Sequence, residues 1–438
     1  MQDWRPVYRL LLRLRDGRTR IWIAPAGAVV GAIALCAVAF ALDRVIAGDG
    51  VPAVGSSSLD DILSVVATSM LAVATFSLGI MVAAFASAAS TATPRATELV
   101  MADDGTRRAI SAFVGSFVFA AVAKTALAFD FYGAVGRFAL LVATLGVLAY
   151  LVARLVLWVR TMSTLGRMAD TLTRIESATR AALEGHVRAP CLGGLPISRA
   201  PAIDARQALR VRPEGTGYVT HVDAAGLHAL AERVDGVCHV LVRPGAYVDP
   251  ATVLAVLAPG DRSPAGDGPI APESLVDTAR RAFVLGRERR FEQDPRFGLI
   301  VLREVAQRAL SPAVNDPGTA IQAASIATSL LVEAARLRDS LEAVAPELDR
   351  VAVVELDEAE LVRDGFDAIA RDGADDPELA IRLQKLLAVV ARHGGGRIGP
   401  AAREQAARAL ERSLGALALA ADRAELAALH GALFGDQG

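Results

Sequence analysis

Long apolar runs without charged residues dominate the first 160 residues of this chain. The longest run covers residues 62–95 and extends for about thirty residues without a charge, from Asp61 to Arg95. As a helix it would be roughly 50 Å long, against a bilayer hydrocarbon core of about 30 Å. It is also rich in Ser, Thr, Ala and Gly, the small residues that let membrane helices pack closely. We therefore interpret it as the central, protein-facing helix of a membrane bundle, protruding from the bilayer at one end.

Three further apolar runs complete the pattern in this part of the chain. They extend from Ile21 to Leu42, from Ala109 to about Phe131, and from Arg137 to about Val159. The first run could also be a signal peptide, since residues 39–41 resemble a cleavage site. It is longer than a signal-peptide core, however, and further spans follow it, which favours an uncleaved helix. The pattern predicts a four-helix transmembrane domain over residues 1–160.

The charges between the runs predict how the spans are oriented. Arginines cluster before the first run, between the second and third, and after the fourth, whereas the other two loops carry mainly aspartates. The arginines are Arg5, Arg9, Arg13, Arg15, Arg18, Arg20, Arg95, Arg107, Arg108, Arg154, Arg160 and Arg167, and the other loops carry Asp43, Arg44, Asp49, Asp60, Asp61 and Asp130. Because basic loops stay in the cytoplasm, we expect a bacterial cytoplasmic (inner) membrane protein with both termini cytoplasmic.

One basic residue falls inside the predicted third span. Lys124 lies roughly two turns from the outer end, where a charge is costly unless it pairs or reaches the interface. Either its long stem extends towards Asp130 and the interface, or its ammonium group serves a pore, a relay or an anion site. The hydroxyl side chains of the second span leave a similar choice between a polar path and hydrogen bonds between helices. They are Thr68, Ser69, Thr75 and Ser77.

The remaining chain has the patterns of a soluble domain. Apolar residues at a three-four spacing predict that residues 161–188 extend the fourth span as a helix. Residues 189–262 begin with a Pro- and Gly-containing loop up to residue 212 and continue as short strands, which predicts a small β-rich module. Residues 263–438 read as mainly helical, with one strand at 350–356 that we expect to join the β-module. The fold class is therefore an α-helical membrane protein followed by a mixed α+β, mainly helical cytoplasmic domain.

Three Asp-Pro pairs predict helix starts in the last part of the chain. Aspartate caps free N–H groups and proline fits the first helical position, at Asp294-Pro295, Asp316-Pro317 and Asp376-Pro377. The first of these starts a predicted helix that runs to Leu310. The final helices are expected at about 357–371, 376–393 and 400–434.

Three segments of the chain resemble a known family. They are ATPRATELVMADDGTRRAISAFVGSFVFA at 92–120, GYVTHVD with VLVRPGAYVDPATVLAVL at 217–257, and GRERRFEQDPRFGLIVLREVAQRALSPAVNDPGTAI at 286–321. Together they resemble bacterial predicted membrane proteins of domain of unknown function 2254. The first segment departs from the family pattern, with STATPR in place of a Gln-Phe-Ser-Pro-Arg-like phrase and Arg108 in place of Gln. The resemblance implies four spans followed by a soluble region, and it implies no established activity.

The last of these segments contains the candidate binding residues. Arginines and the exposed amides of a helix N-terminus can together bind an anion or a phosphate. The candidates for this ligand- or anion-binding site are Arg287, Arg289, Arg290, Asn315, Asp316, Gly318 and Thr319. The structural alternative is a capped helix turn clamped by neighbouring arginines and by acids such as Glu288, Glu292 and Asp294.

Composition narrows the function classes. The chain is 53% hydrophobic and 21% charged, which indicates an apolar part joined to a soluble part, and its net charge of −2 argues against nucleic acid as a partner. The three cysteines lack CxxC spacing and the six histidines lack an HExxH motif, so we expect no metal site. The β-module resembles the barrel-sandwich hybrid of lipoyl and biotinyl domains, but no lysine lies between Lys124 and Lys385 to carry a cofactor. We expect no cofactor and no catalytic residue.

Three functions follow from these patterns. The favoured one is an oligomeric channel or transport-related protein with a cytoplasmic regulatory domain, in which copies of the chain associate in the lipid bilayer. The alternative is a membrane-anchored sensing or scaffold protein that binds an anionic small molecule, an ion or a protein partner through its cytoplasmic domain. A third, an enzyme acting on a lipid or a phosphorylated substrate, rests only on the arginines and the Asn-Asp-Pro turn.

Overall fold

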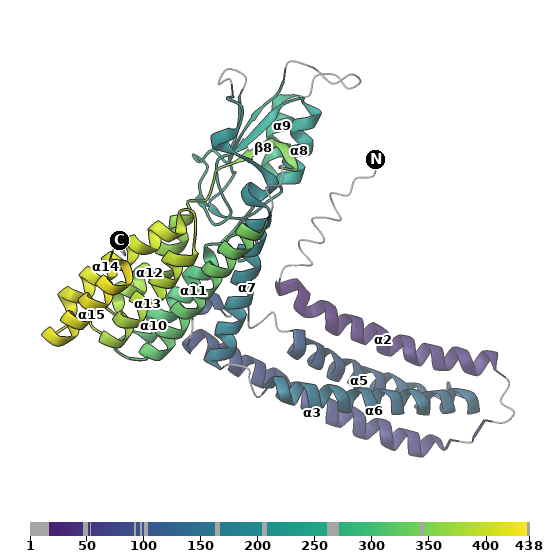
Figure 1. The fold of residues 1–438 in the computed structure, drawn as a ribbon. Helices are drawn as coiled ribbons and strands as arrows, with labels where there is room; N and C mark the ends of the chain where they lie inside the picture. The colour runs from purple at the N-terminus through teal and green to yellow at the C-terminus, as the bar shows by residue number, and fades with distance from the viewer. Residues whose placement is uncertain are drawn as a thin grey trace. The chain divides into compact units, whose positions relative to one another are not determined.

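The computed structural model describes residues 17–46, 51–52, 54–91, 93–96, 99, 104–162, 167–203, 208–260, 271–341 and 346–435. The chain is mostly helical with a small sheet region, and it divides into two compact units (Figure 1). The first unit is Met1–Thr171 and the second is Leu172–Gly438. Each unit is described separately below.

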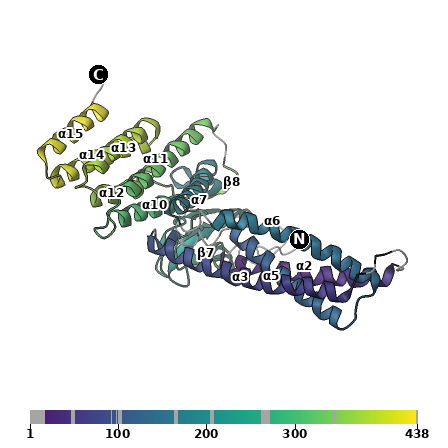
Figure 2. The ribbon, with the colours of Figure 1, turned by 90° about the horizontal axis from the view of Figure 1, so that it is seen from below.

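Four long helices make up the first unit and run side by side in both views (Figures 1 and 2). They are α2 (Gly17–Val45), α3 (Ser56–Thr91), α5 (Asp104–Ala128) and α6 (Ala134–Met162), with a short 3₁₀ turn, η1 (Pro94–Ala96), after α3. Each is long and apolar enough to cross a membrane. A fifth helix of the described chain, α11 (Pro317–Ser340) in the second unit, also meets this criterion. The sequence predicted four spans, and the structure therefore offers five candidates.

The central helix of the first unit is α5, so the prediction that residues 62–95 form the central helix is wrong. Helix α5 packs against α2, α3 and α6, and 50% of its span is buried, compared with 11% of the span of α3. Its small residues allow this close approach, because a Cβ at Gly115 would lie only 2.9 Å from the Cβ of Ala28. Helix α3 is about 54 Å long and leaves most of its surface uncovered within this chain.

Several polar side chains of these helices bond to the backbone. The hydroxyls of Thr68, Thr75 and Ser77 donate to backbone carbonyls four residues earlier in α3, at 2.6 to 2.8 Å. Each of these hydroxyl donors therefore finds its acceptor within α3 itself. Near the end of α2, the Asp43 carboxylate accepts from the backbone N of Gly133 at 2.7 Å and of Gly136 at 2.8 Å. These bonds cap the start of α6.

Two small sheets form the β-region of the second unit. The five-stranded sheet has the order β1-β8-β4-β6-β2 and the three-stranded sheet the order β5-β3-β7. The strands are β1 (Gly194–Pro196), β2 (Leu209–Val211), β3 (Gly217–Val222), β4 (Val237–Val240), β5 (Tyr247–Val248), β6 (Ala255–Ala258), β7 (Phe283–Gly286) and β8 (Leu348–Val353). Strand β8 pairs in parallel with both β1 and β4, which confirms that the strand predicted at 350–356 joins this region.

Short helical pieces connect and cover these strands. They are α8 (Ala224–Arg233), α9 (Pro272–Arg280) and two 3₁₀ turns, η2 (Pro190–Gly193) and η3 (Ile197–Arg199). The longer helix α7 (Met168–Arg188) precedes the first strand. A common apolar core includes Val219, Leu227, Cys238 and Val351. The segment predicted as a loop at 189–212 instead contributes β1 and β2 to the five-stranded sheet. The predicted continuity between the fourth span and α7 falls on residues 163–166, which lie outside the described residues.

The rest of the second unit is a helical bundle. It comprises α10 (Phe297–Ala309), α11, α12 (Glu358–Asp372), α13 (Pro377–His393), α14 (Ile398–Ala416) and α15 (Ala420–Phe434). Asp316 and Asp376 cap α11 and α13 through the backbone N of Thr319 and Leu379, as predicted from the Asp-Pro pairs. The sequence predicted one helix at 400–434, but two form, because the buried Leu417 takes an extended backbone conformation after α14.

Asp294 does not start α10 in the predicted way. The helix begins at Phe297, and the residue at its N-cap position is Arg296, which makes no side-chain cap. The carboxylate of Asp294 is occupied by Arg289 instead, at 2.6 Å. The Arg289–Asp294 pair belongs to the candidate functional site.

Candidate functional site

The residues predicted as one anion site lie at opposite ends of α10. Arg287, Arg289 and Arg290 precede this helix, whereas the residues from Asn315 to Thr319 follow it. Thirteen helical residues correspond to about 20 Å. The structure therefore does not bring the two halves of the predicted site together.

The N-terminus of α11 is occupied by a carboxylate from the chain itself. Asp316 accepts from the backbone N of Thr319 at 3.0 Å and from its hydroxyl at 2.5 Å. These bonds, together with the Gly318 amide, lower the pKa of Asp316 below its usual value. The neighbouring Asn315 has a left-handed backbone, with φ of 48°, and is exposed. An external anion at this end would have to displace the Asp316 carboxylate.

Arg289, by contrast, lies in the wall of a cavity of about 290 Å³. The cavity forms where the two family-like segments of the second unit, residues 217–257 and 286–321, meet. Gly245 N donates to the carbonyl of Val219 at 2.8 Å, and Tyr218 of β3 pairs with Gly286 of β7. The wall is completed by the end of α7, the η2 turn and the end of β8. A single cavity therefore gathers elements that are up to about 170 residues apart in the sequence.

The charged residues of the cavity wall are mostly basic. Arg243, Arg289 and Arg296 line it, and Asp294 is the acidic residue among the lining residues. Burial lowers the pKa of His186, which also lines the cavity and is therefore neutral near pH 7. Burial also raises the pKa of the Cys191 thiol to about 11, so that it carries no charge. The residues that line the cavity thus carry three positive charges and one negative charge, and the acids that balance the other arginines, Glu360 and Asp364, line the second hollow instead.

Arg289 is held rigidly against the turn that follows β4. Its guanidinium pairs with Asp294, which is only 2% exposed, at 2.6 and 2.7 Å. Burial raises the pKa of Asp294 while the Arg289 guanidinium opposes this effect. Gly245 packs directly on this pair with φ of 90°, and a Cβ there would overlap the carboxylate. The Arg243-Pro244-Gly245 turn and the Arg289–Asp294 pair therefore position each other.

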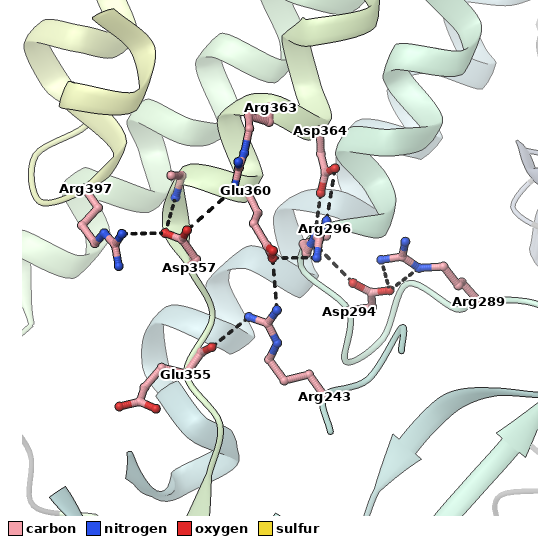
Figure 3. A network of polar contacts seen from close by, with 11 residues as sticks. Arg243, Arg289, Asp294, Arg296, Glu355, Asp357, Glu360, Arg363, Asp364 and Arg397 are labelled. Carbon is pink, nitrogen blue, oxygen red and sulfur yellow. Dashed lines mark hydrogen bonds and ion pairs between the residues drawn. The ribbon is translucent and has the colours of Figure 1, made fainter. Parts of the chain in front are cut away.

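Arg243 and Arg296 share one carboxylate (Figure 3). Glu360 accepts from Arg243 at 3.1 Å and from Arg296 at 2.6 Å, and Arg296 also pairs with Asp364 at 2.6 Å. Arg243 further donates to the carbonyl of Glu355 at 3.1 Å. Because both acids belong to α12, this network connects the β-region to the helical bundle at the cavity.

The same network borders a second, more open hollow of about 500 Å³. Arg296 lines both hollows, and the second is also lined by Arg303, Arg363 and Arg371 together with the acids of α12. Figure 3 shows Asp357 linking Arg363 and Arg397 beside this network, at 3.7 and 3.5 Å.

The cavity wall also contains an unusual backbone. Cys191 and Leu192 both have left-handed conformations, with φ of 53° and 57°. Such conformations are costly for residues other than glycine and occur preferentially at ligand sites and switch regions. Sequence reasoning placed a loop here and gave no indication of this strain.

Sequence reasoning singled out Arg289 but missed Arg243, Arg296, Glu360 and Asp364. Arg243 and Arg296 were visible only as members of the Arg-Pro-Gly and Asp-Pro-Arg phrases. The acids of α12 gave no signal, because a helix face rich in acids is ordinarily solvated. Among the described residues, no group of three or more His, Cys, Asp or Glu side chains could hold a metal ion.

Lys124 in the first unit pairs with a residue that the sequence did not indicate. Its Nζ donates to the Asp60 carboxylate at 2.9 Å and to the Ser64 hydroxyl at 2.6 Å. The expectation named Asp130, but Asp60 lies on the neighbouring helix α3 and α5 packs closely against it. Both side chains of the ion pair are about two-fifths exposed, at 44% and 41%.

Comparison with known proteins is consistent with these observations. Residues 18–389 match the family described as "Predicted membrane protein (DUF2254)". An uncharacterized protein of Mycobacterium bovis and one of Mycobacterium tuberculosis (strain H37Rv) are each 35% identical over 107 residues, which is 24% of this chain and 20% of the relative. This chain thus matches about a fifth of the length of these curated relatives, and no solved structure matches it. Since the family match covers most of the chain, it belongs to the DUF2254 family of predicted membrane proteins.

Proposed function

We propose that this protein is a membrane-anchored sensor whose second unit binds a small anionic ligand in the arginine-lined cavity. One observation carries the proposal: three arginines and a single aspartate line a cavity of about 290 Å³. Arginine forks bind carboxylate and phosphate groups with directed hydrogen bonds. Occupancy would act on Arg296 and Glu360, which join the β-region to α12. Ligand binding is thereby coupled to the packing of the helical bundle.

The membrane arrangement that goes with this proposal has four spans. Helices α2, α3, α5 and α6 cross the cytoplasmic membrane, with both termini in the cytoplasm, as the arginine distribution favours. Helix α11 serves as a core helix of the second unit, because it packs on α10, α12 and α13 within that unit. Its surface also exposes the charged side chains of Glu333 and Arg336, and such charges are unfavourable in a bilayer.

Ligand-induced stabilisation of the purified full-length protein in detergent tests the sensor function. A panel of small anions should include inorganic phosphate, pyrophosphate, nucleotides and dicarboxylates. We expect at least one to raise the unfolding temperature in a saturable way, because a ligand that binds only the folded state stabilises it. Arg243→Gln should weaken this effect by roughly tenfold, as expected for the loss of one charged hydrogen bond.

Arg280→Gln is the matched control for this experiment. Like Arg243, Arg280 pairs with a carboxylate and donates to one backbone carbonyl, with 29% compared with 26% of its side chain exposed. It lies away from the cavity, beside Glu214. Equal weakening by both variants, or a panel without any stabilising anion, would contradict the proposal.

An oligomeric channel or transport-related protein is the second candidate. The partly exposed Lys124–Asp60 pair on the surface of the first unit favours it, because charged groups facing lipid are costly unless protein or water covers them. The small-residue surface of α3 also remains uncovered. Under this function, ion flux into proteoliposomes should change in Lys124→Met and recover in part when Asp60→Asn is added. Liposomes without flux across a range of voltages would exclude it.

A further inference from the structure

In the described part of the chain, three side-chain N–H groups of α6 are buried without an acceptor, on Arg137, Arg154 and Trp158, and the last two lie one turn apart near the end of the helix. Arg154 Nε and Trp158 Nε1 have no hydrogen-bond partner among the residues that the structure describes. Trp158 is only 4% exposed. Residues four positions apart lie one above the other on the same helix face. Because a buried N–H without a partner is unfavourable, the two groups together suit an acceptor that the described part of the chain does not supply.

This helix face is turned towards the other helices of the bundle. The Trp158 ring makes an edge-to-face contact with Phe113 of α5, with the ring centroids 6.0 Å apart. The same face carries further buried residues at helical spacing, namely Leu140, Thr144 and Leu151. Trp158 therefore lies against α5, and this packing fixes the direction of its N–H group. Arg154, one turn earlier, is only partly buried.

Arg154 also lacks a counter-charge within the described first unit. Two acids of that unit, Asp43 and Asp60, engage the start of α6 and Lys124 instead. Arg154 lies at the opposite end of the bundle, eight residues before the end of α6 and about 9 Å along the helix axis from Arg160. A guanidinium at this depth lies within reach of the phosphate layer of the nearer leaflet, because arginine side chains extend towards the interface.

We propose that Arg154 and Trp158 bind the phosphate of a phospholipid headgroup where α6 leaves the membrane. In the orientation proposed above this is the cytoplasmic leaflet. Phosphate oxygens accept from both donors, and the phosphate charge neutralises the guanidinium. Exposed apolar side chains beside Arg154 on the same side of α6, Tyr150 and Leu157, provide a surface for the acyl chains. This surface favours a lipid over free phosphate. The site is independent of the arginine-lined cavity in the second unit.

Thermal unfolding of the full-length protein in a neutral detergent tests this assignment. Phosphatidylglycerol should raise the unfolding temperature in a saturable way, whereas diacylglycerol, which lacks the phosphate, and inorganic phosphate at equal concentration should not. Arg154→Gln should weaken the apparent lipid affinity by roughly tenfold. Trp158→Phe keeps an aromatic ring against Phe113 and removes only the N–H donor, so it should weaken binding while the protein remains folded.

Arg160→Gln provides the matched control, because it removes the same charge from an exposed position of the same helix. It should leave the lipid affinity close to that of the wild type. Three results would overturn the assignment: unchanged affinity in both Arg154→Gln and Trp158→Phe, an equal loss in Arg160→Gln, or protection by inorganic phosphate alone. Should Arg154→Gln fail to fold, the comparison of Trp158→Phe with Arg160→Gln decides the question by itself.

Discussion

Single residues at the cavity hold the second unit in one arrangement. The Asp294 carboxylate is almost completely buried and is satisfied by Arg289 and by the backbone N of Arg296, at 3.2 Å. Such a pair contributes little when intact but is very costly to break, because the remaining charge would stay buried. Gly245 is the third member of this arrangement, since only a residue without a side chain fits against the pair.

Gly245→Ala should therefore destabilise the protein strongly. The new Cβ would overlap Asp294 and lie 2.9 Å from Arg289 Nη2, and alanine is unfavourable at φ of 90°. We expect a loss of about 2–4 kcal/mol in the free energy of unfolding, by denaturant titration of the purified protein. Gly215→Ala, where nothing lies within 4 Å of the added Cβ, is the control and should change stability by less than about 1 kcal/mol. Similar losses in both variants would argue against this packing.

Asp316→Ala should remove a helix cap in a pH-dependent way. The pKa of Asp316 is lowered by its bonds to Thr319, so its stabilisation is present above the ordinary aspartate pKa and is lost as the pH falls through the lowered value. We expect a cost of about 1 kcal/mol at pH 7 that decreases below about pH 4, measured by thermal unfolding. Asp375→Ala, an exposed acid, should show no such pH dependence.

At the level of the elements, helices α11, α12 and α13 are tied together by one arginine. Arg338 of α11 donates to Glu358 in the first turn of α12 at 3.0 Å and to the carbonyl of Gly394 after α13 at 2.9 Å. Gly395, with φ of 56°, leaves room for this guanidinium. The His-Gly-Gly-Gly sequence at 393–396 is thus a helix-ending turn that receives an arginine.

Arg338→Ala should loosen these three helices together. It leaves Glu358 and the Gly394 carbonyl without their shared donor, and we expect a loss of about 2 kcal/mol in unfolding free energy. Arg336→Ala removes an exposed arginine one half-turn earlier and should be close to neutral. Hydrogen exchange should increase in α12 and α13 in the first variant only. Unchanged exchange there would show that the arginine is dispensable.

Which parts of the fold were predictable depended on whether the signal was local. The apolar runs form long helices, and Asp316 and Asp376 cap α11 and α13, as predicted. Both signals depend on neighbours in the sequence. The position of α3 and the use of Asp294 depend on partners that are distant in sequence. The cavity was the least predictable feature, since Arg243, Arg296 and Glu360 come from three separate elements. One sequence contains no information about which arginine meets which acid.

Over the whole molecule, the orientation of the spans can be tested with α11 as an internal check. Single cysteines at Ser57, Asn315 and Leu341 would mark the start of α3 and the two ends of α11, in a background with the three natural cysteines replaced. We expect a membrane-impermeant maleimide to label only Ser57→Cys in intact cells. Permeabilised cells provide the control, since all three should then react. Labelling at one end of α11 but not at the other would show that it crosses the membrane.

The position of β8 has a consequence for how this protein is made. The strand is inserted between β1 and β4, although it emerges from the ribosome about 110 residues after β4. The five-stranded sheet must therefore wait, with β1 separated from the other three strands, until α9, α10 and α11 have been synthesised. During that interval two hydrophobic strand edges remain unpaired, a condition that promotes aggregation. A fragment that ends before residue 348 would keep those edges open, so we expect it to aggregate more readily than a fragment that extends through β8.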